Sequence, residues 1–233
     1  MFKKLIGFTL AELILVMAII GTVAALVLPN LNNNVNEKQT VSKLRKDYVE
    51  LQTAYAGVIS EYGPVENWYT KNDTDEYTTE LFAQRFFKHL QTKKVCGFDD
   101  GCFEVDNIAK TDYEKFYSAV LKDGTAISVA LDAGKEILSK VDSKEDDTSY
   151  LVNLGSIYVD IDSKDKGYNR ADFDMFEFII DIDDIKPTGY QLYNKNIPSA
   201  VLNYTTAWVI KAGNMDYLRC LDELDWDTKK TCK

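Results

Sequence analysis

The chain has 233 residues and a formal net charge of −10, with 27 lysines and arginines against 37 aspartates and glutamates. This acidic balance disfavours binding to nucleic acid, acidic carbohydrate or anionic membrane surfaces, because each of these requires basic side chains at the contact. The length is sufficient for an N-terminal helix followed by one domain with a substantial core.

The sequence contains no recognisable catalytic motif. His89 is its single histidine, which leaves little scope for a histidine-based triad, and the GxSxG, HExxH and GxxxxGKS patterns are missing. We interpret His89 as a surface residue for which the sequence suggests no partner. We therefore expect a protein that is not an enzyme.

Residues 8–28 form a long apolar stretch near the N-terminus. They number 21 and carry a single charge, Glu12. As a helix they would extend about 31 Å, close to the hydrocarbon thickness of a bilayer, which is about 30 Å. The preceding residues, MFKKLIG, include two lysines, and the chain becomes polar directly after Pro29. This arrangement predicts a membrane-spanning helix with nearly all of the remaining chain outside the cytoplasm.

Glu12 is unusual for a plain membrane anchor. A charged residue at the centre of a membrane helix costs about 2.5–3.5 kcal/mol on insertion scales. The cost is lower near the start of a helix, where the helix dipole favours negative charge. On composition alone, Glu12 is therefore interpreted as a glutamate at the membrane interface.

The six residues Gly-Phe-Thr-Leu-Ala-Glu at positions 7–12, followed by the apolar run, resemble the class III signal of type IV pilins and type II secretion pseudopilins. The resemblance implies that a prepilin peptidase cleaves between Gly7 and Phe8 and methylates the new amine of Phe8. It also implies that Glu12 pairs with the N-terminal amine of a neighbouring subunit in a growing filament. An amine and a carboxylate held in lipid are costly alone and stabilised as a pair. Pro29 matches a position at which pilin helices commonly bend.

An ordinary secretory signal is the alternative interpretation of this segment. Such signals have an apolar core of about 7–15 residues and a small-residue cleavage site, and residues 23–25, Val-Ala-Ala, could supply that site. The apolar run before them is longer and contains Glu12. We therefore favour the class III signal, with a leader at residues 1–7.

A second helical pattern follows Pro29 and ends at the helix-stopping pair Gly63 and Pro64. Its apolar residues recur at steps of three and four, which places them on one face of a helix. We expect one helix over residues 8–62, loosened near Pro29, with two separate helices as the alternative. The residues of the apolar face are Val41, Leu44, Tyr48, Leu51, Tyr55, Val58 and Tyr62.

Four cysteines indicate disulfides in an exported domain, and four cysteines allow three pairings. Pairing Cys96 with Cys102 and Cys220 with Cys232 closes two short polar segments, and we favour it. A zinc site is the alternative, but the chain has no CxxC pair.

The region from residue 116 onward favours β-strands. Residues 117–121 and 125–131 flank Lys-Asp-Gly, a strong hairpin signal, and 156–161 and 175–180 have strand character. An amphipathic helical segment at 79–90 precedes them, and Trp208 is expected to be a core residue. The predicted fold is α+β and pilin-like: a long N-terminal helix, with its first half in the membrane, packed against a small antiparallel sheet in a head at residues 63–233.

One acidic segment suggests a metal site. Alternating aspartates followed by a glycine resemble a calcium-binding loop, although the spacing differs from the EF-hand form, and the alternative is a solvated acidic turn. A neighbouring group, Asp181, Asp183 and Asp184, is interpreted as charge at a strand edge that prevents unwanted pairing. The candidate calcium ligands are Asp160, Asp162, Asp165 and Asp172.

The sequence therefore predicts a structural subunit of a type IV pilus or of a type II secretion-like pseudopilus. The expected partners are the prepilin peptidase, other pilin or pseudopilin subunits, the inner-membrane assembly platform and membrane lipid, and none is a nucleic acid. The expected location is the bacterial cytoplasmic membrane, and a filament or the cell surface after assembly. Two alternatives are a membrane-tethered extracytoplasmic binding protein that does not polymerise and, less favoured, a tethered hydrolase.

Overall fold

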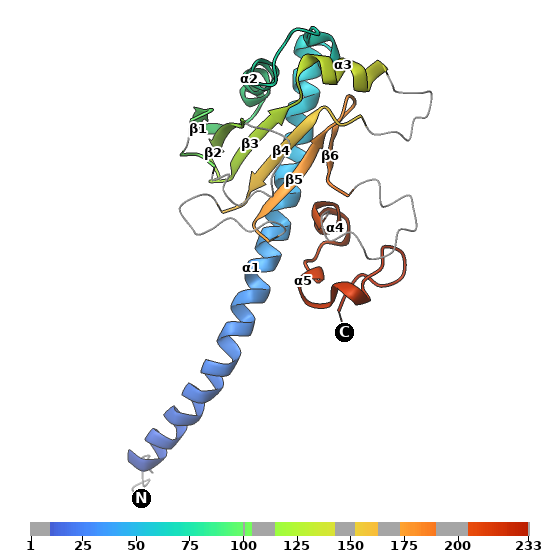
Figure 1. Ribbon diagram of the computed structural model, residues 1–233. Helices are drawn as coiled ribbons and strands as arrows, with labels where there is room; N and C mark the ends of the chain where they lie inside the picture. Colours follow the sequence, from blue (N-terminus) through green and yellow to red (C-terminus); the bar gives the residue numbers. More distant parts are fainter. Residues whose placement is uncertain are drawn as a thin grey trace, which may run out of the picture. The chain divides into compact units, whose positions relative to one another are not determined.

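A computed structural model describes residues 10–99, 101–103, 115–142, 152–162, 173–189 and 205–232, with the backbone alone at 23–35 and 142. The chain forms two compact units, Met1–Gln39 and Thr40–Lys233, of which the second contains the head. Figure 1 shows the arrangement of helices and strands within the head.

The described helices are α1 (Leu10–Tyr62), η1 (Val65–Trp68), α2 (Asp75–Phe86), η2 (Phe87–His89), α3 (Gly134–Asp142), α4 (Thr205–Ala212), α5 (Tyr217–Cys220) and η5 (Leu221–Glu223). The described strands are β1 (Thr92–Gly97), β2 (Tyr117–Leu121), β3 (Ala126–Leu131), β4 (Gly155–Asp160), β5 (Met175–Ile180) and β6 (Ile185–Pro187). Each strand pairs antiparallel with the next, in the order β1-β2-β3-β4-β5-β6. The α+β class is thus confirmed.

The apolar face predicted for the long helix is confirmed within the head. Its residues contact one face of the sheet, where the rings of Tyr48 and Phe178 stack with centroids 5.5 Å apart, and the part of α1 that follows Thr40 runs along this face (Figure 1). Because strand side chains alternate, β3 contributes every second residue to the same core. The helix ends where Gly63 adopts φ 78°, as the stop signal predicts. The most buried residues of this core include Leu44, Leu51, Tyr55, Val58, Ile127, Val129, Leu131, Ile157 and Phe178.

The four segments predicted as strands correspond to β2, β3, β4 and β5, but β1 and β6 were missed. β1 contains two adjacent lysines and two register irregularities, whereas β6 has only three residues and ends in Pro187, so its alternation is too short to recognise. Both strands lie at the ends of the sheet.

His89 is a surface residue, as predicted, but it has a partner that the sequence did not suggest. Its Nε2 lies 3.1 Å from Oε2 of Glu61 in α1. The imidazole also lies against Gly57, where a Cβ atom would come within 2.7 Å of Nδ1. His89 thus packs η2 against the last turns of α1.

Candidate assembly interface

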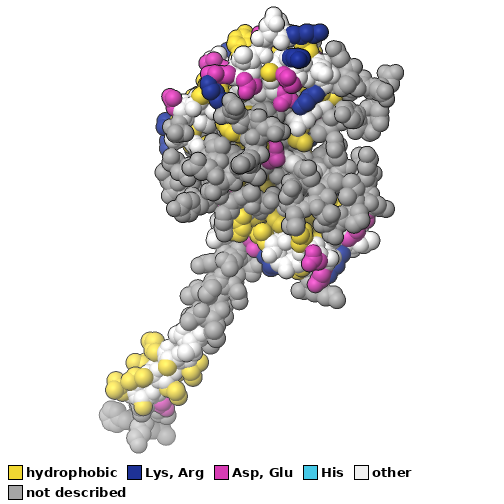
Figure 2. Space-filling view, viewed as in Figure 1, with side chains coloured by type: hydrophobic (Ala, Val, Ile, Leu, Met, Phe, Trp, Pro, Cys, Tyr) yellow, Lys and Arg dark blue, Asp and Glu magenta, His cyan; other side chains and the backbone are white. Residues whose placement is uncertain are grey.

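The first section of α1 presents many exposed apolar side chains. Figure 2 shows them (yellow) around the described start of the helix. Every large hydrophobic residue among them is at least 48% exposed, and Leu10 reaches 77%. An exposed apolar surface of this extent marks a contact site, because full burial of each such side chain contributes about 1.5–3 kcal/mol. Its members are Leu10, Leu13, Ile14, Leu15, Val16, Met17, Ile19 and Ile20.

Glu12 lies in the first turn of α1, and its side chain is exposed among these apolar residues. The helix dipole favours a carboxylate at this position. Gly7 and Phe8, the predicted processing residues, lie outside the described residues. Of the predicted processing and assembly residues Gly7, Phe8 and Glu12, the structure therefore describes Glu12.

Within the described part of the chain, no helical stretch combines the length and the hydrophobicity that crossing a bilayer requires. The predicted span at 8–28 lies partly outside the description, because residues 8 and 9 and the side chains of 23–28 are not included.

The predicted calcium site is described only in part. Asp160 is buried in β4, and its Oδ1 accepts a hydrogen bond of 3.1 Å from the backbone N–H of Asp162. Asp165 and Asp172 lie outside the described residues. Among the side chains that are described, no group of three or more His, Cys, Asp or Glu residues is placed to hold a metal ion. Calcium binding stays a prediction.

Both predicted disulfides are confirmed, with Cys96 bonded to Cys102 and Cys220 bonded to Cys232. Bonding of all four thiols excludes the zinc alternative. Cys96 belongs to β1, so the first disulfide closes the turn that follows this strand at the edge of the sheet.

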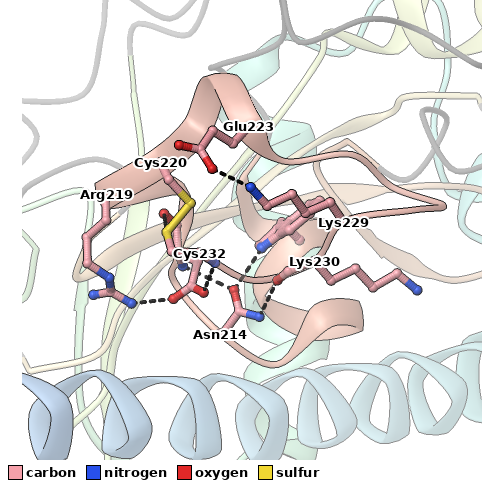
Figure 3. Close-up of a disulfide and its surroundings, with 9 residues drawn as sticks. Asn214, Arg219, Cys220, Glu223, Lys229, Lys230 and Cys232 are labelled. Carbon is pink, nitrogen blue, oxygen red and sulfur yellow. Dashed lines mark hydrogen bonds and ion pairs between the residues drawn. A yellow bond between two sulfur atoms is a disulfide. The ribbon is translucent and has the colours of Figure 1, made fainter.

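The second disulfide closes a C-terminal loop that is held by hydrogen bonds from both sides (Figure 3). The side chain of Asn214 donates to the backbone carbonyl of Lys230 (2.8 Å), and its Oδ1 accepts from the indole N–H of Trp208 (3.0 Å). Asp216 accepts from the backbone N–H of Cys232 (2.7 Å). Trp208 is buried, as predicted. These bonds tether the end of the loop, at Lys230 and Cys232, to the segment that follows α4.

Arg45 of α1 joins this C-terminal segment to the long helix. Its Nε and Nη2 donate to the carbonyl of Ile210, at 2.9 and 2.8 Å, near the C-terminal end of α4. The last carbonyls of a helix have no partner within it, and a cation there also interacts favourably with the dipole. Gly213, just after α4, has φ 75°, and a Cβ atom there would lie 2.6 Å from Nη2 of Arg45.

Replacing Gly213 with alanine is expected to reduce the free energy of unfolding by about 1–2 kcal/mol. About 1 kcal/mol comes from the left-handed backbone conformation, and the rest from displacement of the arginine. In an Arg45→Met background the second contribution should disappear, leaving only the backbone cost. Urea unfolding of the four proteins in this cycle measures both parts. Equal effects of Gly213→Ala in the two backgrounds would contradict the contact with Arg45.

Two buried aspartates have roles that the sequence did not predict. Asp181 contacts α1 from the sheet side, and Asp47 belongs to α1 itself. Asp181 was interpreted as a strand-edge charge, but it is buried and pairs with Lys186. Asp47 is buried on the inner face of α1, where its Oδ2 accepts a hydrogen bond from Thr125 Oγ1 (3.1 Å). Burial raises the pKa of Asp47 to about 6, and the nearby Asp123 charge acts in the same direction.

A signal for Asp47 was present in the sequence. It lies three residues after Leu44 and four before Leu51, so it occupies the apolar face of the helix. A carboxylate on an otherwise apolar helix face is an exception to the pattern, and this exception could have identified Asp47 as a buried group.

Comparison of the chain with protein families, with curated proteins and with solved structures finds no match.

Proposed function

We propose that this chain is a structural subunit of a type IV pilus or of a type II secretion-like pseudopilus. The observation that carries the proposal is the first section of α1, an exposed apolar helix with one carboxylate, Glu12, in its first turn. The likeness of residues 7–12 to the class III signal supports the same interpretation. The two disulfides fit a head outside the cytoplasm.

In the proposed mechanism, the membrane holds the apolar helix until it joins a bundle of like helices. Prepilin peptidase removes residues 1–7 and leaves a methylated amine on Phe8. Glu12 of the next subunit then pairs with this amine, because both groups are poorly solvated beside lipid and gain most from each other there. Burial of the exposed apolar side chains between neighbouring helices stabilises the bundle. The head remains outside it.

Glu12→Ala is expected to leave cleavage and membrane insertion intact while lowering incorporation into filaments at least tenfold. Intact-mass measurement of the mature chain reads cleavage and methylation, and the amount of subunit in sheared filaments reads incorporation. Glu37→Ala, which removes a carboxylate from a later turn of α1, is the matched control and should assemble normally. Incorporation of the Glu12→Ala subunit at the unmodified level would contradict the ion-pair mechanism.

The tethered binding protein is distinguished by the same measurements. A correctly cleaved wild-type chain that stays dispersed in the envelope, with no filament-associated density in immunogold images, would favour it. A mature chain that starts at Leu26, or one that retains Met1, would contradict the predicted leader.

A further inference from the structure

One segment of this acidic chain is strongly basic. Residues 81–98 contain one arginine, three lysines and the histidine, and no acidic residue. They form the end of α2, η2 and β1. Lysine or arginine side chains gathered in one place within a chain of net charge −10 create a local field opposite to that of the rest of the surface.

Three of the lysines around β1 define a basic edge: Lys93, Lys94 and Lys122. All three side chains are exposed, and the backbone N–H of Lys122 donates to the carbonyl of Gln91, just before β1 (2.9 Å). Within the described residues, none of the three forms an ion pair. Several other lysines of the head are paired, as Lys115 is with Glu76. The basic edge therefore presents charge that the described part of its own head does not neutralise.

The C-terminal loop has the opposite character. Residues 222–227, here called the acidic loop, contain four acidic residues and no basic residue. Glu223 is paired with Lys229, and Asp225 accepts hydrogen bonds from Thr228. Asp222 and Asp227 are exposed and form no ion pair among the described residues.

The acidic loop is rigidly held. The Cys220–Cys232 disulfide closes it, and the ring of Trp226 lies against Trp208 with centroids 4.7 Å apart. A preorganised loop loses little conformational entropy when it binds.

The two charged surfaces lie at opposite sides of the sheet. β1 is the first strand in the sheet order, whereas α4, which precedes the acidic loop, packs beside β5 and β6 at the other end. Figure 1 shows β1 and the C-terminal segment on separate sides of the head. A contact between two different surfaces of identical chains does not close on itself in pairs. It generates rings where the rotation closes and open helical filaments where it does not.

We propose that the basic edge of one copy docks against the acidic loop of the next copy. This proposal rests on the proposed filament function and names the contact between heads. Exposed ion pairs are each worth little, but complementary patches accelerate encounter and fix the orientation of the partners. In this arrangement the α1 helices supply the apolar contact, and the charged surfaces set which side of each head meets its neighbour.

Charge exchange tests the contact in the full chain. Lys93→Glu/Lys94→Glu and Asp222→Lys/Asp227→Lys are each expected to lower filament incorporation about tenfold, and combining them should restore it to within about threefold of wild type. Lys71→Glu/Lys135→Glu, which changes two exposed lysines elsewhere on the head, carries the same change in net charge and should have little effect. Incorporation of Lys93→Glu/Lys94→Glu (the β1 variant) at the level of this control would overturn the proposal. Failure of the combined variant to recover incorporation would also overturn it.

A second measurement keeps the proposal separate from the filament function. Detergent-solubilised full chain should self-associate at low salt and lose most of this association at 0.5 M NaCl, an ionic strength at which exposed charges about 4 Å or more apart are largely screened. The β1 variant should show no such salt-dependent association. If the wild-type chain forms no filaments, the proposed filament function fails. Sedimentation of the detergent-solubilised chain, which measures self-association, would still test the contact between heads. Loss of binding to anionic lipid vesicles in the β1 variant, with unchanged self-association, would identify a membrane surface as the partner instead and overturn the proposal.

Discussion

Replacing Lys186 with methionine is expected to lower the free energy of unfolding by about 3 kcal/mol. Its ammonium group pairs with Asp181, whose side chain is 2% exposed. Removal of one partner from a buried ion pair leaves the other as an uncompensated charge and typically costs about 3–5 kcal/mol. We place the effect at the lower end because the lysine side chain is 22% exposed. Urea unfolding at pH 7 measures the change.

The cost should be large because Asp181 has several structural roles. Its Oδ1 accepts hydrogen bonds from the backbone N–H groups of Val152 (3.0 Å) and Ile182 (2.9 Å). Its backbone carbonyl accepts from the hydroxyl of Tyr55 in α1 (2.6 Å). Loss of Lys186 therefore disturbs a group that also holds the backbone at Val152 and Ile182.

Two further variants identify the cause of the loss. Lys135→Met changes an exposed lysine and should alter the free energy of unfolding by no more than about 0.5 kcal/mol. Asp181→Asn combined with Lys186→Met should recover part of the stability, because no uncompensated charge remains. A loss below about 1 kcal/mol in the single variant would show that water solvates Asp181 adequately without the lysine.

The sequence predicted what repeats regularly and missed what depends on distant partners. The apolar face of α1 recurs over many turns, so a few residues sufficed to locate it. The disulfides joined cysteines that are close in the chain. The burial of Asp181 depends on the pairing of β5 with β6, which brings Lys186 beside it. The aspartates would have the same sequence whether they were buried in an ion pair or exposed at a strand edge. Their charge therefore led to the prediction of an exposed edge.

The candidate assembly interface shows the same limit. Composition was enough to predict an apolar helix with one internal carboxylate, and the first section of α1 has both. The basic edge was missed because β1 was not recognised as a strand. The position of its adjacent lysines at the edge of a sheet could therefore not be predicted. The acidic loop was visible as sequence, but its relation to the opposite end of the sheet follows only from the fold.

Replacing Asp47 with asparagine is expected to have the opposite effect and to raise the free energy of unfolding at pH 8 by about 1–3 kcal/mol. Among the described residues, Oδ1 of Asp47 has no hydrogen-bond partner, and Nζ of Lys46 is 3.8 Å away. The ionised form is therefore poorly compensated, which agrees with a pKa raised to about 6 by burial first and by Asp123 second. An upward shift of about two pKa units corresponds to about 3 kcal/mol at most. Asparagine keeps the shape and removes the charge.

The pH dependence distinguishes this cause from simple repacking. An unfolded aspartate has a pKa of about 3.9, so between about pH 6 and pH 4 the folded protein binds the proton more tightly than the unfolded chain does. Lowering the pH through this window therefore relieves the penalty, and the advantage of Asp47→Asn over wild type should shrink to near zero by about pH 4. Comparing the two proteins at each pH cancels the titration of other carboxylates, to the extent that they do not interact with Asp47.

Two neighbouring changes should shift the result in opposite directions. Thr125→Val removes the hydroxyl that donates to Oδ2, so it should destabilise the protein more at pH 8 than at pH 4. Asp123→Asn removes a neighbouring negative charge, so it should reduce the stabilisation by Asp47→Asn at pH 8. A benefit of Asp47→Asn that stays constant from pH 8 to pH 4 would mean that the carboxyl group does not titrate in this window. The charge of Asp47 would then not affect the stability of the contact between α1 and the β2–β3 turn.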